Sequence, residues 1–298
     1  MRVVLSGSGG LIGGALAPAL SGAGHEVVRL VRSEARPGAA RWDPAAGVLD
    51  ERDLHGADAV VHLAGAGIGD RRWTAARRTE ILDSRVRGTE LLARTVAGMR
   101  RPPAVLVSAS AVGWYGDRGD EVLTEDSSGG TGFLASLCRA WEGATAPAEE
   151  AGVRVVHLRS GVVLARHGGA LARQLPLFRA GLGGRLGSGR QWLSWITLED
   201  EVAVVVRVLG DATLVGPVNA CSPSPVTNAQ FTRTLARVLH RPAIARVPRI
   251  ALRAVLGGEL ADELVLASQR AVPARLLAAG FSFGLDALEG ALASVLAP

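Results

Sequence analysis

The 298-residue chain contains no lysine, a single tyrosine and only two cysteines. All 33 of its basic residues are therefore arginines. Any mechanism that needs a lysine or a second tyrosine is excluded, whatever the fold. Cys138 and Cys221 are too few for a disulfide framework or a cysteine-based zinc site, so we expect two small packed side chains and no bound metal.

Clustered charge and long hydrophobic runs are also lacking. The arginines are spread along the chain, and no basic stripe alternates with aromatic residues, so the net charge of +5 does not indicate a nucleic-acid partner. Residues 3–24 are uncharged, but glycines and Pro18 interrupt them, which argues against a signal peptide or a membrane span. We expect a soluble, cytoplasmic protein that acts on a small molecule.

The chain is nevertheless apolar enough to fold around a sizeable core, with 48% hydrophobic and 20% charged residues. Strand-like and helix-like segments alternate in its first half. Strands are expected at residues 3–5, 27–31, 59–63, 105–107 and 153–158, with the end of a further short one at 42–44. Helices are expected at residues 11–21, 74–97 and 134–150. Strands joined by crossover helices predict an α/β fold with a doubly wound parallel sheet.

A glycine-rich turn lies between the first strand and the first helix. Gly7, Gly10 and Gly13 follow the GxxGxxG spacing. The first glycine allows the tight turn, the second lets the backbone approach a pyrophosphate, and the third lets helix and strand pack closely. Free N–H groups of the helix start then favour an anion, so Ser8, Leu11 and Ile12 are expected to contact it as well. This pattern predicts a Rossmann-type dinucleotide site; the alternative is a merely flexible turn.

The end of the second strand indicates which dinucleotide is bound. An NAD site places an acidic residue there to hold the ribose 2′-OH, whereas this chain has Arg32 followed by Ser33. A guanidinium can pair with a 2′-phosphate, and a charge-assisted hydrogen bond contributes about 1.5–3 kcal/mol. We therefore predict NADP(H). The alternative is that Arg32 is a solvated side chain just past the strand.

Later strand ends add further candidates, because reactive groups collect at the carboxyl ends of parallel strands. Small residues after the 59–63 strand would let the adenosine half lie against the backbone. Those expected to contact the cofactor at the two later strand ends are Leu63, Ala64, Gly65, Ser108 and Ala109. Ser110 and Tyr115 are candidates for polarising or protonating a substrate carbonyl, although Tyr115 could equally be a packed aromatic residue.

The pattern changes after about residue 166, where helices are expected at residues 171–180, 199–209 and 228–239. Thr227 is the expected N-cap of the last of these helices. Residues 246–298 are expected to be helical with breaks at Pro248 and Pro273. This back third looks too fragmented to add more sheet. We predict a Rossmann domain made of residues 1–165 and about 192–222. A smaller, mostly helical lobe on the substrate side would comprise about 166–191 and 223–298.

Several segments resemble the extended short-chain dehydrogenase/reductase superfamily. Over its whole length the chain more closely resembles an atypical branch, the "epimerase family" of NAD-dependent epimerase/dehydratase-like proteins. The segments that carry this resemblance are LAGAGIGDRRW (63–73), SASAVGWYG (108–116), GFLASLCRAWE (132–142), RSGVVLARHGGAL (159–171), GLGGRLGSGRQWLSWI (181–196), GPVNACSPSPVTNAQF (216–231) and LLAAGFSF (276–283). The resemblance implies an NADP-binding Rossmann domain with a small C-terminal domain.

The resemblance also shows what this chain lacks. The superfamily's Tyr-x-x-x-Lys pair falls on Leu134 and Cys138. The arginine with which sugar-nucleotide epimerases grip phosphates falls near Leu193. Arg159, at the end of the 153–158 strand, is expected either to face the cofactor or to pair with an acid. The substrate pocket is expected to include Trp73, Arg185, Gln191 and Trp195.

Two functions remain open on this evidence. The first is an NADP(H)-dependent oxidoreductase acting on a small carbonyl-type or conjugated substrate, with Ser110 and Tyr115 assisting. The second is a catalytically silent NADP(H)-binding regulatory or scaffold protein, which the missing pair favours. Nucleotide-sugar epimerisation is a minor alternative.

Overall fold

The computed structural model describes residues 1–32 and 37–297. At its centre lies an eight-stranded sheet with the order β13-β8-β6-β5-β1-β2-β3-β4. Its strands are β1 (Arg2–Ser6), β2 (Glu26–Val31), β3 (Ala39–Asp43), β4 (Val48–Leu49), β5 (Ala59–His62), β6 (Val105–Ala111), β8 (Arg154–Ser160) and β13 (Gly216–Ala220). Neighbouring strands run parallel except β3 and β4, which are antiparallel. The predicted parallel sheet is confirmed.

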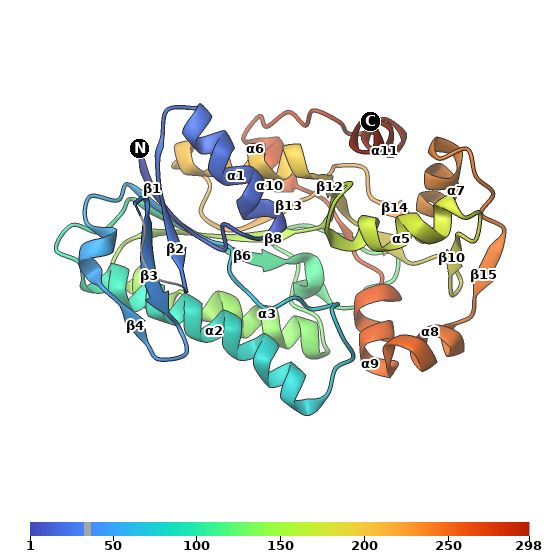
Figure 1. Ribbon diagram of the computed structural model, residues 1–298, viewed down its shortest axis with the longest axis horizontal. Coiled ribbons are helices and arrows are strands. Elements are labelled where there is room, and N and C mark those ends of the chain that lie inside the picture. Colours follow the sequence, from blue (N-terminus) through green and yellow to red (C-terminus); the bar gives the residue numbers. More distant parts are fainter. Residues whose placement is uncertain (33–36, 298) are drawn as a thin grey trace.

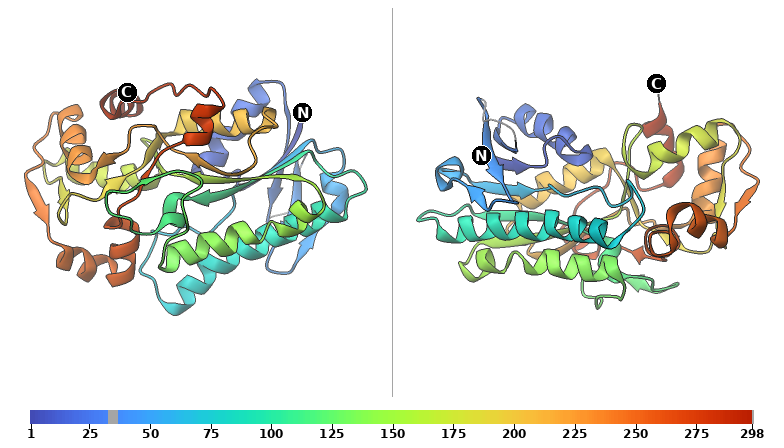
Figure 2. Two further views of the ribbon diagram at one scale, coloured as in Figure 1. Left: turned by 180° about the vertical axis from the view of Figure 1, so that it is seen from behind. Right: turned by 60° about the horizontal axis from the view of Figure 1, so that its bottom comes forward.

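Helices cover both faces of this sheet (Figures 1 and 2). α1 (Leu11–Gly22) and α6 (Leu198–Gly210) lie on one face. α2 (Ala75–Gly98), α3 (Phe133–Gly143) and α4 (Ala146–Glu150) lie on the other. Each face has its own hydrophobic layer, and the central strand β5 is buried along its entire length. Continuous burial is typical of parallel strands covered on both sides. The doubly wound architecture is thus confirmed.

Local sequence signals explain where several helices begin. The Thr74 side chain accepts a hydrogen bond from the Arg77 N–H at the start of α2, and Thr197 caps α6 in the same way. Thr227 caps α7 (Asn228–Val238) and forms a capping box with Gln230. The predicted N-cap at Thr227 is confirmed. Each cap satisfies an N–H group that the first turn of a helix leaves without a partner.

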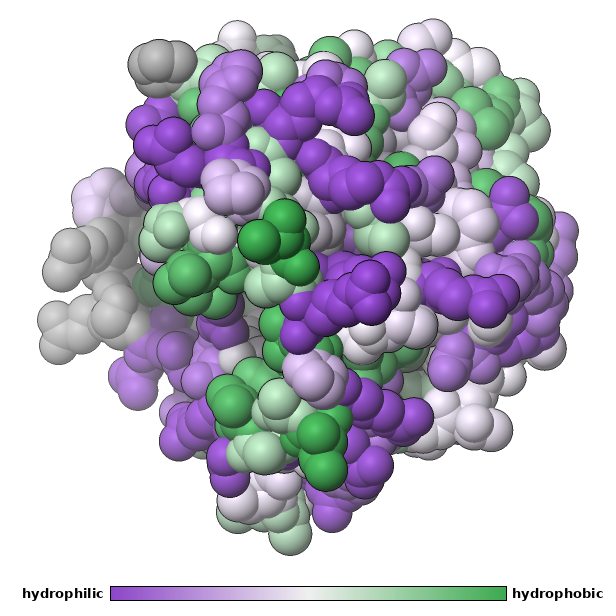
Figure 3. Space-filling model, turned by 90° about the vertical axis from the view of Figure 1, so that its right-hand side faces the viewer, coloured by the Kyte–Doolittle hydropathy of each residue, from purple (hydrophilic) through white to green (hydrophobic). Residues whose placement is uncertain are grey.

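The later part of the chain builds a mostly helical region at one end of the molecule (Figure 1). Here α5 (Gly169–Arg179), α7 and α11 (Leu288–Leu296) share a hydrophobic core. α8 (Arg249–Leu256), α9 (Gly258–Leu260) and a π-helical turn (Ala261–Val265) make up the rest, whereas α10 (Ala274–Ala278) packs against the main sheet, where Leu276 joins its core. Pro248 and Pro273 stand directly before α8 and α10, as predicted. The outer face of this end mixes hydrophilic and hydrophobic side chains (Figure 3).

Two expectations about secondary structure are wrong. The helix expected at residues 134–150 is two helices, because α3 ends at Gly143 and α4 begins again at Ala146 with Pro147 in its first turn. The back third does contain strands. β13 extends the main sheet, and four two-stranded sheets pair β9 (Val162–Leu164) with β12 (Trp195–Thr197), β10 (Gly184–Leu186) with β15 (Ala245–Val247), β11 (Trp192–Leu193) with β14 (Val226–Thr227) and β7 (Val122–Leu123) with β16 (Arg270–Ala271). Except for β13, these strands have only two or three residues, which is too short to produce a visible period.

Within residues 1–32 and 37–297, no helix is both long and apolar enough to cross a membrane. The boundaries proposed between a Rossmann domain and a smaller lobe stay a prediction. Residues 216–220 form β13, which pairs with β8 in the main sheet.

Candidate functional site

The glycine turn packs tightly against its neighbours. Gly7 has φ of +74°, and a Cβ there would lie 2.7 Å from the backbone of Leu63 and Ala64. A Cβ on Gly13 would lie 2.3 Å from the Gly7 carbonyl oxygen. Gly10 is the N-cap of α1, and no side chain caps the helix there. The start of α1 therefore presents backbone N–H groups at the carboxyl edge of the sheet, and its residues fit a dinucleotide pyrophosphate.

The other residues expected around this turn are placed as follows. Ser8 lies in the turn, and Leu11 and Ile12 form the first residues of α1. Arg32 is exposed directly after β2 ends, at the same edge of the sheet as the glycine turn. Ser33 lies outside the described residues. The position of Arg32 fits a role in binding a 2′-phosphate, which stays a prediction.

Two buried arginines of α2 hold the loop that follows β5. Arg85 donates to the Ala66 carbonyl at 2.9 Å, and Arg77 donates to the Gly67 carbonyl. Arg85 also packs beneath Gly65, where a Cβ would lie 3.1 Å from the guanidinium carbon. These contacts fix the backbone of residues 65–67 beside the glycine turn. The sequence of α2 is that of an ordinary amphipathic helix, so it gave no sign that Arg77 and Arg85 bind this loop.

His62 is the buried last residue of β5. Its Nδ1 lies 2.6 Å from the Ser6 hydroxyl at the end of β1. Burial, and then the neighbouring charge of Arg85, lower the pKa of His62 to about 3. The imidazole is therefore neutral at physiological pH, and its contacts are those of a packed strand residue.

The end of β6 leads into a buried polar network that the sequence did not reveal. Ser110 donates a hydrogen bond to Glu142 at 2.6 Å. Arg159 binds the same carboxylate through both of its oxygens, at 2.8 and 2.9 Å. The Trp114 ring stacks on the Arg159 guanidinium at 4.0 Å. Of the two possibilities for Arg159, the geometry favours the ion pair with an acid, because a buried guanidinium must have a partner.

Tyr115 belongs to the same network and has no exposed surface. Its hydroxyl donates to Asn219 Oδ1 at 2.8 Å and accepts from Arg159 at 3.2 Å. Burial is the main effect on its pKa and raises it to about 12, despite the nearby Arg159. The geometry therefore favours the packed alternative for Tyr115. Ser108 and Ala109, the predicted cofactor contacts of this strand, precede the network in β6, and Ser108 is buried.

The resemblance places the superfamily's catalytic pair on Leu134 and Cys138, and this correspondence stays a prediction. Leu134 and Cys138 are both buried on α3. Burial, followed by the charge of Glu142, raises the pKa of the Cys138 thiol to about 11. Glu142 lies one helical turn beyond Cys138 and accepts hydrogen bonds from Arg159 and Ser110. Glu142 and Asn219 meet their partners only in the folded chain, so the sequence could not show which residues they would bind.

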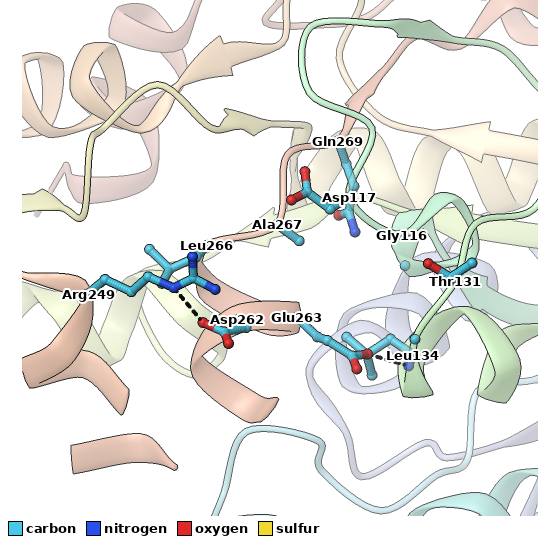
Figure 4. Close-up of a pocket in the computed structure, with 12 residues that line it drawn as sticks. Gly116, Asp117, Thr131, Leu134, Arg249, Asp262, Glu263, Leu266, Ala267 and Gln269 are labelled. Atoms are coloured by element: carbon cyan, nitrogen blue, oxygen red, sulfur yellow. Dashed lines mark hydrogen bonds and ion pairs between the residues drawn. The ribbon is translucent and has the colours of Figure 1, made fainter. Parts of the chain in front are cut away.

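A cavity of about 260 Å³ adjoins Leu134 (Figure 4). The residues that line it are Gly113, Gly116, Asp117, Thr131, Gly132, Leu134, Arg249, Asp262, Glu263, Leu266, Ala267 and Gln269. It lies between the start of α3 and the π-helical turn of the C-terminal region. The sequence drew attention to Leu134 and to motifs that contain Gly113, Gly116 and Gly132, whereas the other lining residues come from distant segments and gave no signal.

None of the four residues expected in the substrate pocket lines this cavity. Trp195 is fully buried, and its indole donates to the Ser224 carbonyl. The Gln191 amide donates to the Leu186 carbonyl at 3.1 Å. Trp73 packs edge-on against Phe133, with ring centroids 5.0 Å apart. Arg185 lies on β10 beside Arg246 of β15. A role for these four residues at the substrate stays a prediction.

Comparisons with known proteins agree with this geometry. A family model described as the NAD-dependent epimerase/dehydratase family matches residues 3–220. The chain belongs to this family. A second model, described only as a domain of unknown function, matches residues 247–295. The resemblance to the "epimerase family" is thus confirmed.

Relatives of the epimerase/dehydratase family match over the whole chain. An epimerase family protein of Mycobacterium bovis is 48% identical over 97% of this chain and 96% of its own. The crystal structure of human epimerase family protein SDR39U1 with NADPH superposes with a TM-score of 0.91, at 36% identity over 99% of both chains. A structure titled nucleoside-diphosphate sugar epimerase, from Corynebacterium glutamicum, has a TM-score of 0.82 at 40% identity and is covered over 58% of its length.

Proposed function

We propose that this protein binds NADP(H) and is an oxidoreductase for a small substrate held in the cavity beside Leu134. The glycine turn carries the first part of the proposal, since Gly7 and Gly13 leave no room for a Cβ and α1 begins without a side-chain cap. The human relative solved with NADPH supports the same cofactor. Arg32, in the place of an acidic residue, supports the phosphorylated form.

When bound, the cofactor supplies or accepts a hydride. The protein's own residues position it and shape the space next to it. Arg77 and Arg85 hold the loop after β5, against which the adenosine half would lie. The Glu142–Arg159 pair holds Ser110 and Tyr115 in place, and Tyr115 ends the short helix whose Gly113 lines the cavity.

The source of the proton differs from that of the superfamily. Leu134 and Cys138 do not supply the proton in this proposal, and the Ser110 hydroxyl is already engaged as the donor of a hydrogen bond to Glu142. Neither Ser110 nor Tyr115 lines the cavity. The proposed roles of Ser110 and Tyr115 are therefore positioning roles, and the proton reaches the substrate from water that enters the cavity.

A catalytically silent NADP(H)-binding protein is the second candidate, and the same observation favours it. No described residue replaces the Tyr-x-x-x-Lys pair at its usual place on α3. Nucleotide-sugar epimerisation is less well supported, because a cavity of about 260 Å³ is smaller than the 300–1,000 Å³ typical of drug-sized ligand sites. The cytoplasmic location and a small-molecule partner remain part of the proposal.

Titration calorimetry and NADPH oxidation together test these candidates. The proposal expects NADPH to bind more tightly than NADH, and a panel of small carbonyl compounds to include one that oxidises bound NADPH. Ser110→Ala and Tyr115→Phe should keep measurable turnover, because neither hydroxyl reaches the cavity. Tight NADPH binding without turnover of any compound in the panel would favour the silent candidate, and equal affinity for both coenzymes would remove the argument from Arg32.

A further inference from the structure

The cavity beside Leu134 has an acidic lining. Asp117, Asp262 and Glu263 contribute three carboxyl groups to it. Arg249 is the single basic residue among its lining residues, and its guanidinium donates to Asp262 at 3.0 Å. Figure 4 shows Asp262 and Glu263 on one side of the cavity, facing Asp117 and Gln269 on the other. An anion that entered would meet several negative groups and a cation that is already paired.

The start of α3 is the one other feature that would attract an anion, because helix N-termini carry a partial positive charge. Glu263 already occupies it. Its two carboxylate oxygens accept hydrogen bonds from the N–H groups of Phe133 and Leu134 at 2.9 and 2.8 Å. A Cβ on Gly132 would lie 2.9 Å from the same carboxylate. The chain therefore fills its own anion site with a side chain from the C-terminal region.

Hydrogen-bond acceptors remain available on the opposite wall. Asp117 accepts from the Ser268 N–H through Oδ1, and no described residue donates to its Oδ2. The Gln269 side chain likewise has no hydrogen-bond partner among residues 1–32 and 37–297, and Figure 4 shows it next to Asp117. These carboxylates do not form a metal site, since no three His, Cys, Asp or Glu side chains gather suitably in the described residues.

The remaining wall and the volume limit the size of the ligand. Leu134, Leu266 and Ala267 give the cavity an apolar side. About 260 Å³ is enough for a compound of a few carbon atoms and its hydration, and too little for a nucleoside diphosphate joined to a sugar.

We propose that the cavity takes a small carbonyl compound that carries an amino or hydroxyl group, and that it discriminates against carboxylates and phosphates. The amino or hydroxyl group donates hydrogen bonds to Asp117, while the apolar wall contacts the carbon skeleton. This inference deepens the proposed function, because the ligand is the substrate of that reaction. Charge selection by the wall follows from the lining residues alone, and so it can be tested without turnover.

Three ketones of nearly equal size provide the test: aminoacetone, hydroxyacetone and pyruvate, which are cationic, neutral and anionic. Binding to the NADP⁺-loaded protein is measured by saturation-transfer NMR and calorimetry, since the oxidised cofactor cannot reduce a ketone. We expect aminoacetone to bind most tightly, hydroxyacetone next and pyruvate at least about fivefold more weakly than hydroxyacetone, as expected for a single charge contact near the surface.

Asp117→Asn keeps an oxygen for the Ser268 N–H and removes the charge. It should weaken aminoacetone about fivefold and hydroxyacetone less, because a hydroxyl can accept a hydrogen bond from the new amide N–H whereas an ammonium group cannot. Asp83→Asn, which alters a surface ion pair with Arg87 on α2, is the matched control and should change neither. Equal or tighter binding of pyruvate, or no binding of any of the three ketones, would overturn the inference.

The same samples separate this inference from the proposed function. If aminoacetone and hydroxyacetone bind but NADPH is never oxidised, charge selection stands and the oxidoreductase proposal fails. If NADPH is oxidised with pyruvate in preference to both, the oxidoreductase proposal stands and the inference fails.

Discussion

Replacing Gly13 by alanine is the sharpest perturbation of the cofactor site. The new methyl carbon would lie 2.3 Å from the Gly7 carbonyl oxygen and 2.9 Å from the Gly7 carbonyl carbon and the Ser8 Cα. All three atoms belong to the backbone, so a side-chain rotation cannot relieve the contact. Either α1 moves away from β1 or the turn opens. Overpacking of this kind costs about 1–3 kcal/mol of folding free energy.

The effect on the cofactor should exceed the effect on stability. A turn displaced by several tenths of an ångström no longer directs its N–H groups at the pyrophosphate. We expect the dissociation constant for NADPH, measured by calorimetry, to rise at least about tenfold, which corresponds to the loss of one charge-assisted hydrogen bond. The folded fraction is checked by circular dichroism at the same temperature.

Gly14→Ala is the matched control in the same helix. A Cβ at Gly14 would lie 3.7 Å from its nearest neighbour, the Ser8 carbonyl oxygen, which is ordinary contact. Because alanine favours a helix over glycine, this variant should be more stable by up to about 1 kcal/mol and bind NADPH normally. The reasoning fails if Gly13→Ala binds NADPH as tightly as Gly14→Ala does.

Three further predictions concern charged residues. Arg32→Asp should reverse the preference for NADPH over NADH by at least about tenfold in competition binding; an unchanged ratio would show that Arg32 is only a solvated side chain. Glu142→Gln breaks the buried pair with Arg159 and should lower the free energy of unfolding in urea by about 3–5 kcal/mol, whereas Glu90→Gln, in an exposed ion pair, should cost less than about 1 kcal/mol. Burial raises the pKa of Glu201 from 4.5 to about 7, so the folded chain retains a proton that the unfolded chain loses, and stability falls as pH rises across that interval. Glu201→Gln should remove about 3 kcal/mol of that pH dependence, and identical pH profiles would contradict it.

The sequence allowed the fold and the cofactor turn to be predicted because both depend on local patterns. Gly7, Gly10 and Gly13 lie within one turn and the helix that follows it. Strand-like and helix-like segments alternate along the first half of the chain, and each segment can be recognised from its own residues. Short strands such as β10 and β15 were missed because their pairing is not local. The break between α3 and α4 could have been anticipated from Gly143 and Pro147.

The rest of the site depends on residues that meet only after folding. Glu263 reaches the start of α3 across 130 residues of sequence. The partners of Arg159, which are Glu142 and Tyr115, likewise come from separate elements. An isolated glutamate in a helix carries no sign of such a partner. The Trp73 ring packs on Phe133 and the Trp195 indole donates to the Ser224 carbonyl, and the roles expected for both at a substrate pocket stay predictions.

A crystal structure of this protein grown with NADPH tests the central claim most directly. The account predicts electron density for the pyrophosphate within hydrogen-bonding distance of the N–H groups at the start of α1, with the 2′-phosphate beside Arg32 and the nicotinamide next to Leu134. Density for the dinucleotide at any other part of the sheet edge, or none at saturating NADPH, would contradict it.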